Sequence, residues 1–216
     1  MKLSIFLLCC ITLISLSCST PTYILTNRGQ TIGVDFTKGK WVLNELDCPS
    51  SSKEKLTSVS YDFFKKNLND SLFYIKDVKN LLITRKIPLN PNATKLKELK
   101  VGTGFDYFIN ISTKRNKNEM NSIELYQTDN EVALNQSEVT LEIYDLNSKL
   151  IIYTQRVVGS TSKEKKMTAW PGETPKSDKL IDNVNFYKSS NNLMLGSLKK
   201  ILKDLKKKSI LNKKDK

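Results

Sequence analysis

The chain has 216 residues, 35 Lys and Arg against 22 Asp and Glu, a formal net charge of +13, and no histidine. This length allows one ordinary domain or two small ones, and 39% hydrophobic residues can bury a single core. The lack of histidine excludes Ser-His-Asp and Cys-His catalysis and the usual His-containing metal sites. We therefore expect a protein that is not an enzyme and holds no metal or cofactor.

The N-terminus has the pattern of an export signal. Met1-Lys2 is short and positive, and Leu3–Leu16 is an apolar run. As a helix, this run would extend roughly 21 Å, short of the roughly 30 Å hydrocarbon core of a bilayer. The segment is therefore typical of a signal peptide and not of a membrane span.

The run ends in Ser15-Leu16-Ser17-Cys18, which resembles a bacterial lipobox. The resemblance implies cleavage between Ser17 and Cys18, so that residues 1–17 are removed and Cys18 becomes the first mature residue. It also implies that the Cys18 thiol receives a diacylglycerol and its amine a third acyl chain. The pattern departs from the lipobox at Ser15, where Leu is usual.

The other cysteines are interpreted from this cleavage. Cys9 and Cys10 leave with the signal peptide, so an acylated Cys18 makes Cys48 a free thiol. The alternative is a Cys18–Cys48 disulfide, which needs a conventional cleavage site upstream of Cys18. Ser19, in place of the Asp that retains lipoproteins in the inner membrane, implies transfer to the outer membrane. The uncharged segment Thr20–Tyr23, in place of the acidic tract of surface-exported lipoproteins, favours the periplasmic face.

Turn-forming residues dominate the start of the mature chain, so residues 18–39 are predicted to be a tether with one short strand around Thr31–Phe36. A helix is predicted over 52–68, with capping-box spacing from Ser51 to Glu54. Ser50-x-x-Lys53 matches a serine–lysine motif of penicillin-interacting enzymes, but the partner motifs are missing and we reject it. Strands are predicted at 40–46, 72–75 and 80–84.

Asn92 is predicted to cap a short helix over 93–101. Gly102-Thr103-Gly104 follows, and it indicates a helix C-cap and not a phosphate loop, because the next segment is a strand over 105–111. A further short strand is predicted at 123–126. The clearest hairpin pairs 139–144 with 150–158.

The last predicted helix covers 191–207 and has one apolar stripe. The segment from Lys199 to Lys216 carries nine Lys and two Asp, a net charge of +7. The stripe fails after Leu205, so residues 208–216 are predicted to be a solvated basic tail. The stripe consists of Met194, Leu198, Ile201, Leu202 and Leu205.

These elements predict an α/β (α+β) domain over 40–207, with a mixed sheet of about five strands packed against two or three helices. Three segments, 98–112, 139–160 and 195–207, resemble the module shared by the TolB N-terminal domain, CsgG and the penicillin-binding-protein activator LpoB. The resemblance implies an envelope protein that works by contact. It departs at Lys149, where the hairpin of that group has Gly.

Three functional hypotheses follow. The first is a lipid-anchored periplasmic protein, held in the membrane by acyl chains on Cys18, that binds another envelope protein through a loop containing Trp170 and Pro171. The alternative is binding of an anionic lipid or cell-wall polymer by lysines of the C-terminal segment. The third, least favoured, is carboxylate catalysis by Glu138, Glu142 and Asp145. A nucleic-acid partner is not expected, because the signal peptide directs the chain away from it. The lysines of the second hypothesis are Lys199, Lys200, Lys203, Lys206, Lys207 and Lys208.

Overall fold

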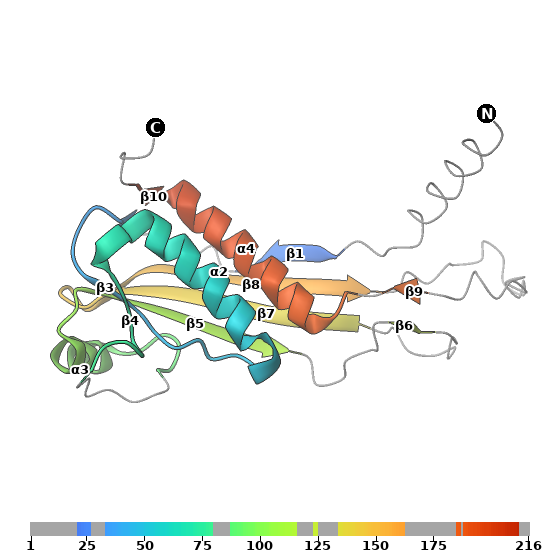
Figure 1. Cartoon of the computed structure of the whole chain (residues 1–216), viewed down its shortest axis with the longest axis horizontal. Helices are drawn as coiled ribbons and strands as arrows, with labels where there is room; N and C mark the ends of the chain where they lie inside the picture. Colours follow the sequence, from blue (N-terminus) through green and yellow to red (C-terminus); the bar gives the residue numbers. More distant parts are fainter. Residues whose placement is uncertain are drawn as a thin grey trace, which may run out of the picture.

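A mixed six-stranded sheet with three helices forms the body of the protein, in agreement with the predicted α/β class (Figure 1). The computed structural model describes residues 21–26, 33–79, 87–115, 123–124, 134–162, 185–186 and 188–211. The strand order is β1-β8-β7-β5-β3-β4. Its strands are β1 (Thr22–Leu25), β3 (Trp41–Leu43), β4 (Leu72–Tyr74), β5 (Tyr107–Arg115), β7 (Leu134–Asp145) and β8 (Leu150–Ser162).

The first half of the chain builds the parallel part of the sheet. β3 pairs in parallel with β4 on one side and with β5 on the other. The crossovers are made by α2 (Ser50–Leu68) and α3 (Ala93–Thr103). The short 3₁₀ helix η1 (Asn69–Ser71) joins α2 to β4. Parallel neighbours need such crossovers, which explains why helices alternate with strands here.

The second half of the chain builds the antiparallel part. β7 pairs with β5 and forms the predicted hairpin with β8, with an irregularity between Ile143 and Tyr144. Lys149 in the turn has φ 59°, a left-handed conformation that usually favours glycine. Asp145 Oδ1 offsets this by accepting the backbone N–H groups of Asn147 and Ser148. The chain then closes with α4 (Ser190–Lys208).

Two hydrophobic clusters cover opposite faces of the sheet. The larger lies between the sheet and the helices α2 and α4, and includes Trp41, Ile109 and Leu198, each fully buried. The smaller joins α3 to the other face through Leu96, Leu99 and other residues. Trp41 is the largest side chain of the larger cluster, and its ring stacks on Tyr107 at 4.1 Å between centroids.

Several predicted elements are confirmed. The side chain of Asn92 caps α3 by accepting Lys95 N–H at 2.9 Å, and Gly104 ends that helix in the left-handed conformation, with φ 71°. All five stripe residues of α4 are buried. The predicted strand at 123–126 is present as β6 (Ile123–Glu124), which pairs with β9 (Asn185–Phe186). The predicted strand at 80–84 lies outside the described residues.

Residues 18–39, predicted to be a tether, contain the expected short strand as β2 (Val34–Asp35) and also a strand that the sequence did not indicate, β1. β1 pairs with β8, and β2 pairs in parallel with β10 (Ser209–Ile210). Tyr23 is the one residue of β1 that is not exposed, and it packs so closely against α4 that a Cβ on Gly196 would lie 2.1 Å from its hydroxyl oxygen. An edge strand with one inward-facing residue has no alternation of apolar and polar residues, so the sequence did not indicate β1.

Two helix ends also differ from the predictions. The capping box is wrong, because α2 begins at Ser50 after Pro49, and no side chain caps it. The basic tail was predicted to begin at residue 208, but α4 includes Lys208, and β10 follows it directly. Leu211 packs against the larger cluster. Residues 209 and 210 have no apolar helical stripe, but their pairing with β2 orders them.

Candidate functional site

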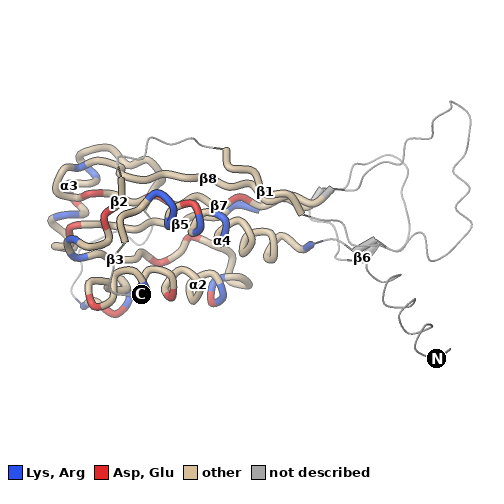
Figure 2. The backbone as a smooth tube through the Cα atoms, turned by 90° about the horizontal axis from the view of Figure 1, so that it is seen from above, with Lys and Arg blue, Asp and Glu red and all other residues tan. Residues whose placement is uncertain are grey.

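The most distinctive described surface is a stripe of lysines along α4. Lys199, Lys200, Lys203, Lys206 and Lys207 follow helical spacing and are all exposed. We call these five residues the lysine face (Figure 2). At 1.5 Å per residue, the face extends about 12 Å along the helix.

The fold explains why these lysines point outward. The opposite side of α4 is buried against β7 and β8 through residues such as Leu198, Ile201 and Leu205. Ser189 begins the helix by accepting Asn192 N–H at 3.4 Å. The last three lysines of α4 lie in its final turn, where the helix dipole favours positive charge.

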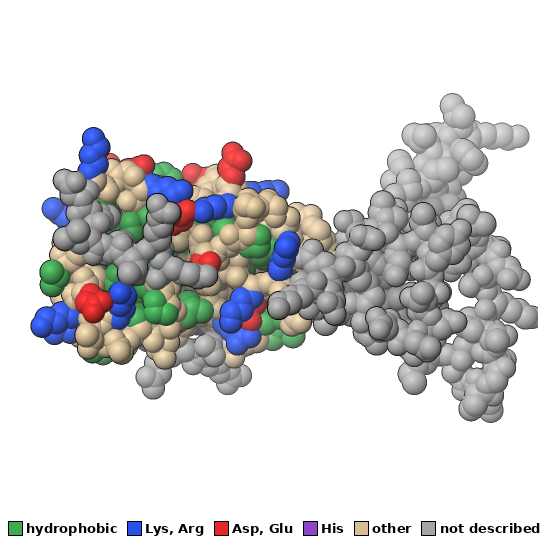
Figure 3. All heavy atoms as spheres, turned by 90° about the horizontal axis from the view of Figure 1, so that it is seen from below, with side chains coloured by type: hydrophobic (Ala, Val, Ile, Leu, Met, Phe, Trp, Pro, Cys, Tyr) green, Lys and Arg blue, Asp and Glu red, His purple; other side chains and the backbone are tan. Residues whose placement is uncertain are grey.

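Lys208, the sixth predicted lysine, belongs to a different arrangement. Its ammonium lies 2.8 Å from Asp204 Oδ2, which also accepts the buried hydroxyl of Tyr153 at 3.0 Å. The hydrogen bond from Tyr153 links β8 to α4, and the ion pair within α4 leaves Lys208 partly neutralised. Elsewhere the surface is mixed, and Figure 3 shows basic and acidic side chains interspersed on the face seen from below.

The other predicted site residues lie outside the described residues. These are Ser17 and Cys18 at the signal cleavage point, and Trp170 and Pro171 in the predicted contact loop. The structure still bounds the first of these sites. Three residues lie between Cys18 and Thr22, the first residue of β1, and the four chain steps from Cys18 to Thr22 span at most about 14 Å.

The three carboxylates of the catalytic hypothesis do not form a shared site. Glu138 forms an ion pair with Arg156, and Asp145 holds the hairpin turn. Glu142 is 5% exposed and accepts the Tyr144 hydroxyl at 2.7 Å and Asn90 N–H at 2.8 Å. Each of the three has hydrogen-bond or ion-pair partners within the fold.

Other chemically suggestive residues are also held in structural contacts. Lys53 of the rejected serine–lysine motif forms an ion pair with Glu45. Cys48 is a free cysteine, and burial raises the pKa of its thiol, which makes it a poor nucleophile. Among the described residues, no cluster of three or more His, Cys, Asp or Glu side chains could hold a metal ion.

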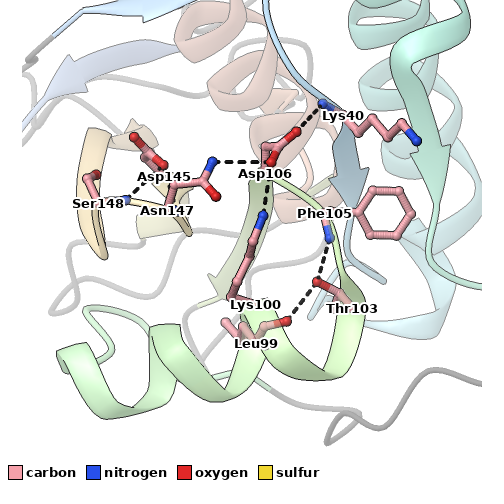
Figure 4. Close-up of polar contacts among 9 residues, drawn as sticks. All are labelled: Lys40, Leu99, Lys100, Thr103, Phe105, Asp106, Asp145, Asn147 and Ser148. Carbon is pink, nitrogen blue, oxygen red and sulfur yellow. Dashed lines mark hydrogen bonds and ion pairs between the residues drawn. The ribbon is translucent and has the colours of Figure 1, made fainter.

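Asp106 joins three separate segments of the described fold and was missed as a functional candidate by sequence reasoning (Figure 4). Its Oδ2 accepts Lys40 N–H at 3.0 Å, and its Oδ1 accepts Lys100 Nζ at 2.9 Å and Asn147 Nδ2 at 3.2 Å. These partners lie before β3, on α3 and in the β7–β8 turn. The Lys40 amide and the Lys100 ammonium lower the pKa of Asp106 from 3.8 to about 2.

We expect Asp106→Asn to destabilise the domain at neutral pH, because an amide cannot accept all three donors. A lowered pKa stabilises the fold above the unfolded value of 3.8 and loses that contribution as the pH falls towards 2. With the side chain 32% exposed, solvent screening reduces the effect to the order of 1 kcal/mol. Urea unfolding of wild type and variant should therefore differ at pH 7 and converge near about pH 2. Asp70→Asn, which changes a fully exposed carboxylate, is the matched control and should have no effect.

The fold and its exposed features define a mixed α/β domain with a helix that presents lysines. Within the described residues, no helix is both long and apolar enough to cross a membrane. No family model matches the chain, and no curated protein matches its sequence.

Solved structures of bacterial proteins resemble the fold distantly. A PelC dodecamer from Paraburkholderia phytofirmans is 9% identical over 88% of this chain and 99% of that chain, with a TM-score of 0.39. The hypothetical protein CT253 from Chlamydia trachomatis is 11% identical over 79% of this chain and 97% of that chain, with a TM-score of 0.40. Lipoprotein GNA1162 from Neisseria meningitidis is 8% identical over 60% of this chain and 88% of that chain, with a TM-score of 0.38. Similarity at this level assigns no function, and the TolB, CsgG and LpoB grouping stays a prediction.

Proposed function

We propose that this protein is a lipid-anchored, non-catalytic binding module of the bacterial cell envelope. Acyl chains on Cys18 hold it in the outer membrane, facing the periplasm, and the lysine face of α4 contacts an anionic lipid or cell-wall polymer. The observation that carries the proposal is the lysine face itself. Five exposed lysines project from one side of an ordered helix whose other side is buried.

A rigid row of lysines differs from a solvated lysine-rich tail. In a tail, each contact with an anionic surface costs the entropy of ordering the backbone, whereas α4 is already ordered. Each lysine near an anionic membrane contributes about 1 kcal/mol. Together, the five residues would contribute about 5 kcal/mol to salt-dependent association with such a surface.

The short link between Cys18 and β1 supports action close to the membrane. Since that link spans at most about 14 Å, an acylated Cys18 keeps the domain near the lipid surface. The protein partner expected at Trp170 and Pro171 stays a prediction. Photo-crosslinking in cells from positions around Trp170 is its test, and recovery of no partner at native expression would count against it.

The lysine face can be tested by removing three of its charges. We expect the triple variant Lys199→Gln, Lys203→Gln and Lys206→Gln to bind anionic vesicles about 100-fold more weakly, from about 1 kcal/mol per lysine. Vesicle flotation at low salt measures this change, in proteins that all carry Cys18→Ala so that acyl chains do not dominate binding. The effect should shrink as salt rises, because exposed charges are screened.

A matched control keeps the same change of net charge. Lys66, Lys79 and Lys97 are exposed lysines outside α4, and their triple change to Gln should leave binding nearly unaltered. Equal losses for both triple variants would show that only net charge matters. That result would refute the lysine face as a site.

A further inference from the structure

A pocket lies where the helices α2 and α4 begin. The two helices run side by side, with their first turns at the same end of the molecule (Figure 1). The pocket has a volume of about 290 Å³, at the lower end of the range for small-molecule sites. Its polar lining consists of Ser51, Ser52, Lys55, Ser189, Asn191 and Asn192.

The electrostatics of this pocket favour an anion. Each helix has 19 residues, and neither has an acidic residue in its first turn. A helix N-terminus carries roughly half a positive charge, and two of them meet here. α2 follows Pro49 and has no side-chain cap, so no side-chain oxygen accepts a hydrogen bond from its first backbone N–H groups. Lys55 adds a full positive charge to the lining.

Unpaired polar atoms are a second, independent feature of the pocket. Ser52 is only 5% exposed, yet its hydroxyl finds no hydrogen-bond partner among the described residues. Asn191 donates Nδ2–H to Ser51 Oγ at 3.3 Å, while its Oδ1 is also without a partner in the described part of the chain. Buried polar groups are nearly always paired, so such groups lining a pocket point to a missing ligand.

We propose that this pocket binds a phosphate ester that carries a neighbouring hydroxyl group, of which glycerol phosphate is the smallest example. The hydroxyls of Ser51 and Ser52, the α2 N-terminus and Lys55 bind the phosphate oxygens. The unpaired Oδ1 of Asn191 accepts the ligand hydroxyl. This site is separate from the lysine face, which lies further along α4.

The same chemistry has two sources: a free phosphate ester or a lipid headgroup such as phosphatidylglycerol. The position of the pocket makes the headgroup accessible. Lys188, just before α4, lies 5.9 Å from the ring centroid of Tyr23 in β1, so the first turn of α4 is close to the strand that follows Cys18. Access of a lipid headgroup to the pocket rests on the proposed acyl anchor at Cys18, whereas binding of a free phosphate ester does not.

The test uses the full chain purified in a neutral detergent and a phosphate-free buffer. Calorimetric titration with glycerol phosphate should show saturable binding, and Ser52→Ala should weaken it at least tenfold. Because Ser52→Ala removes an unpaired buried hydroxyl, the Tm of the unliganded variant should be unchanged or higher. Ser58→Ala, an exposed serine of the same helix that donates to Asp62, is the matched control and should bind as wild type does.

Two outcomes would overturn the site. One is the absence of binding up to about 10 mM glycerol phosphate, beyond the range of weak specific affinity. The other is equal affinity of wild type and Ser52→Ala. Sodium chloride at matched ionic strength accounts for any heat from screening alone.

Vesicle flotation distinguishes the two sources of the ligand. If the headgroup is the ligand, Ser52→Ala should also reduce binding to phosphatidylglycerol vesicles relative to phosphatidylcholine vesicles. If only binding of soluble glycerol phosphate falls, the ligand is free. The triple variant of the lysine face should keep its affinity for soluble glycerol phosphate, so failure of one proposal is distinguishable from failure of the other.

Discussion

Changing Cys18 to Ala should abolish acylation and release the protein from the membrane fraction. Each buried CH2 of an acyl chain contributes about 0.8 kcal/mol, so the chains together exceed any contribution expected from the lysines. Metabolic labelling with palmitate and membrane fractionation measure the two effects. Wild type should be labelled and sediment with membranes, whereas the variant should be unlabelled and largely soluble.

The matched control for this experiment is Cys48→Ala. Cys48 is a free, half-buried cysteine of the described fold, and its loss should change neither labelling nor fractionation. Palmitate labelling that survives Cys18→Ala would show that the anchor lies elsewhere. A disulfide-linked Cys18 would instead give an unlabelled wild type.

The second large effect is expected from Trp41→Ala. Trp41 is fully buried and stacks on Tyr107, and its ring centroid lies 5.4 Å from that of Phe36. Its Nε1–H donates to the backbone oxygen of Lys38 at 2.7 Å. Removing a buried Trp costs about 3–5 kcal/mol, because both transfer free energy and packing are lost. This cost is a large fraction of the roughly 5–15 kcal/mol that stabilises a domain.

Urea unfolding followed by far-UV circular dichroism measures this loss, because it does not depend on the removed fluorophore. Trp41→Phe should cost less, since it keeps an aromatic ring beside Tyr107. Val101→Ala removes methyl groups from a side chain that is 80% exposed and should change the free energy of unfolding by less than about 0.5 kcal/mol. A loss below about 1 kcal/mol for Trp41→Ala would contradict its place in the core.

Binding by the lysine face and by the helix-start pocket would combine with the anchor in a simple way. An acylated Cys18 limits the domain to a thin layer at the membrane, which raises the effective concentration of nearby anionic groups. Contacts that are individually weak then become significant. Both sites are fixed by the same helix, α4, whose buried stripe holds it against the sheet.

Features that depend on local periodicity can be predicted from the amino-acid sequence alone. The hairpin of β7 and β8, the cap of α3 at Asn92 and the buried stripe of α4 follow from alternation, capping and 3.6-residue spacing. The outward direction of the lysines follows from the same spacing. The lipobox-like run ending at Cys18 is also a local pattern, and its chemistry stays a prediction.

Only the tertiary structure decided the features that join distant segments. β1 reads as a tether until Tyr23 is seen packed against Gly196, and β10 pairs with β2 across most of the chain. Asp106 is one polar residue among many in the sequence, and its role depends on a donor as distant as Asn147. Ser52 stands out only because the folded chain buries its hydroxyl without a hydrogen-bond partner in the described residues. Edge pairing and convergent hydrogen bonding leave no period in a sequence, because each involves only one or two residues from each segment.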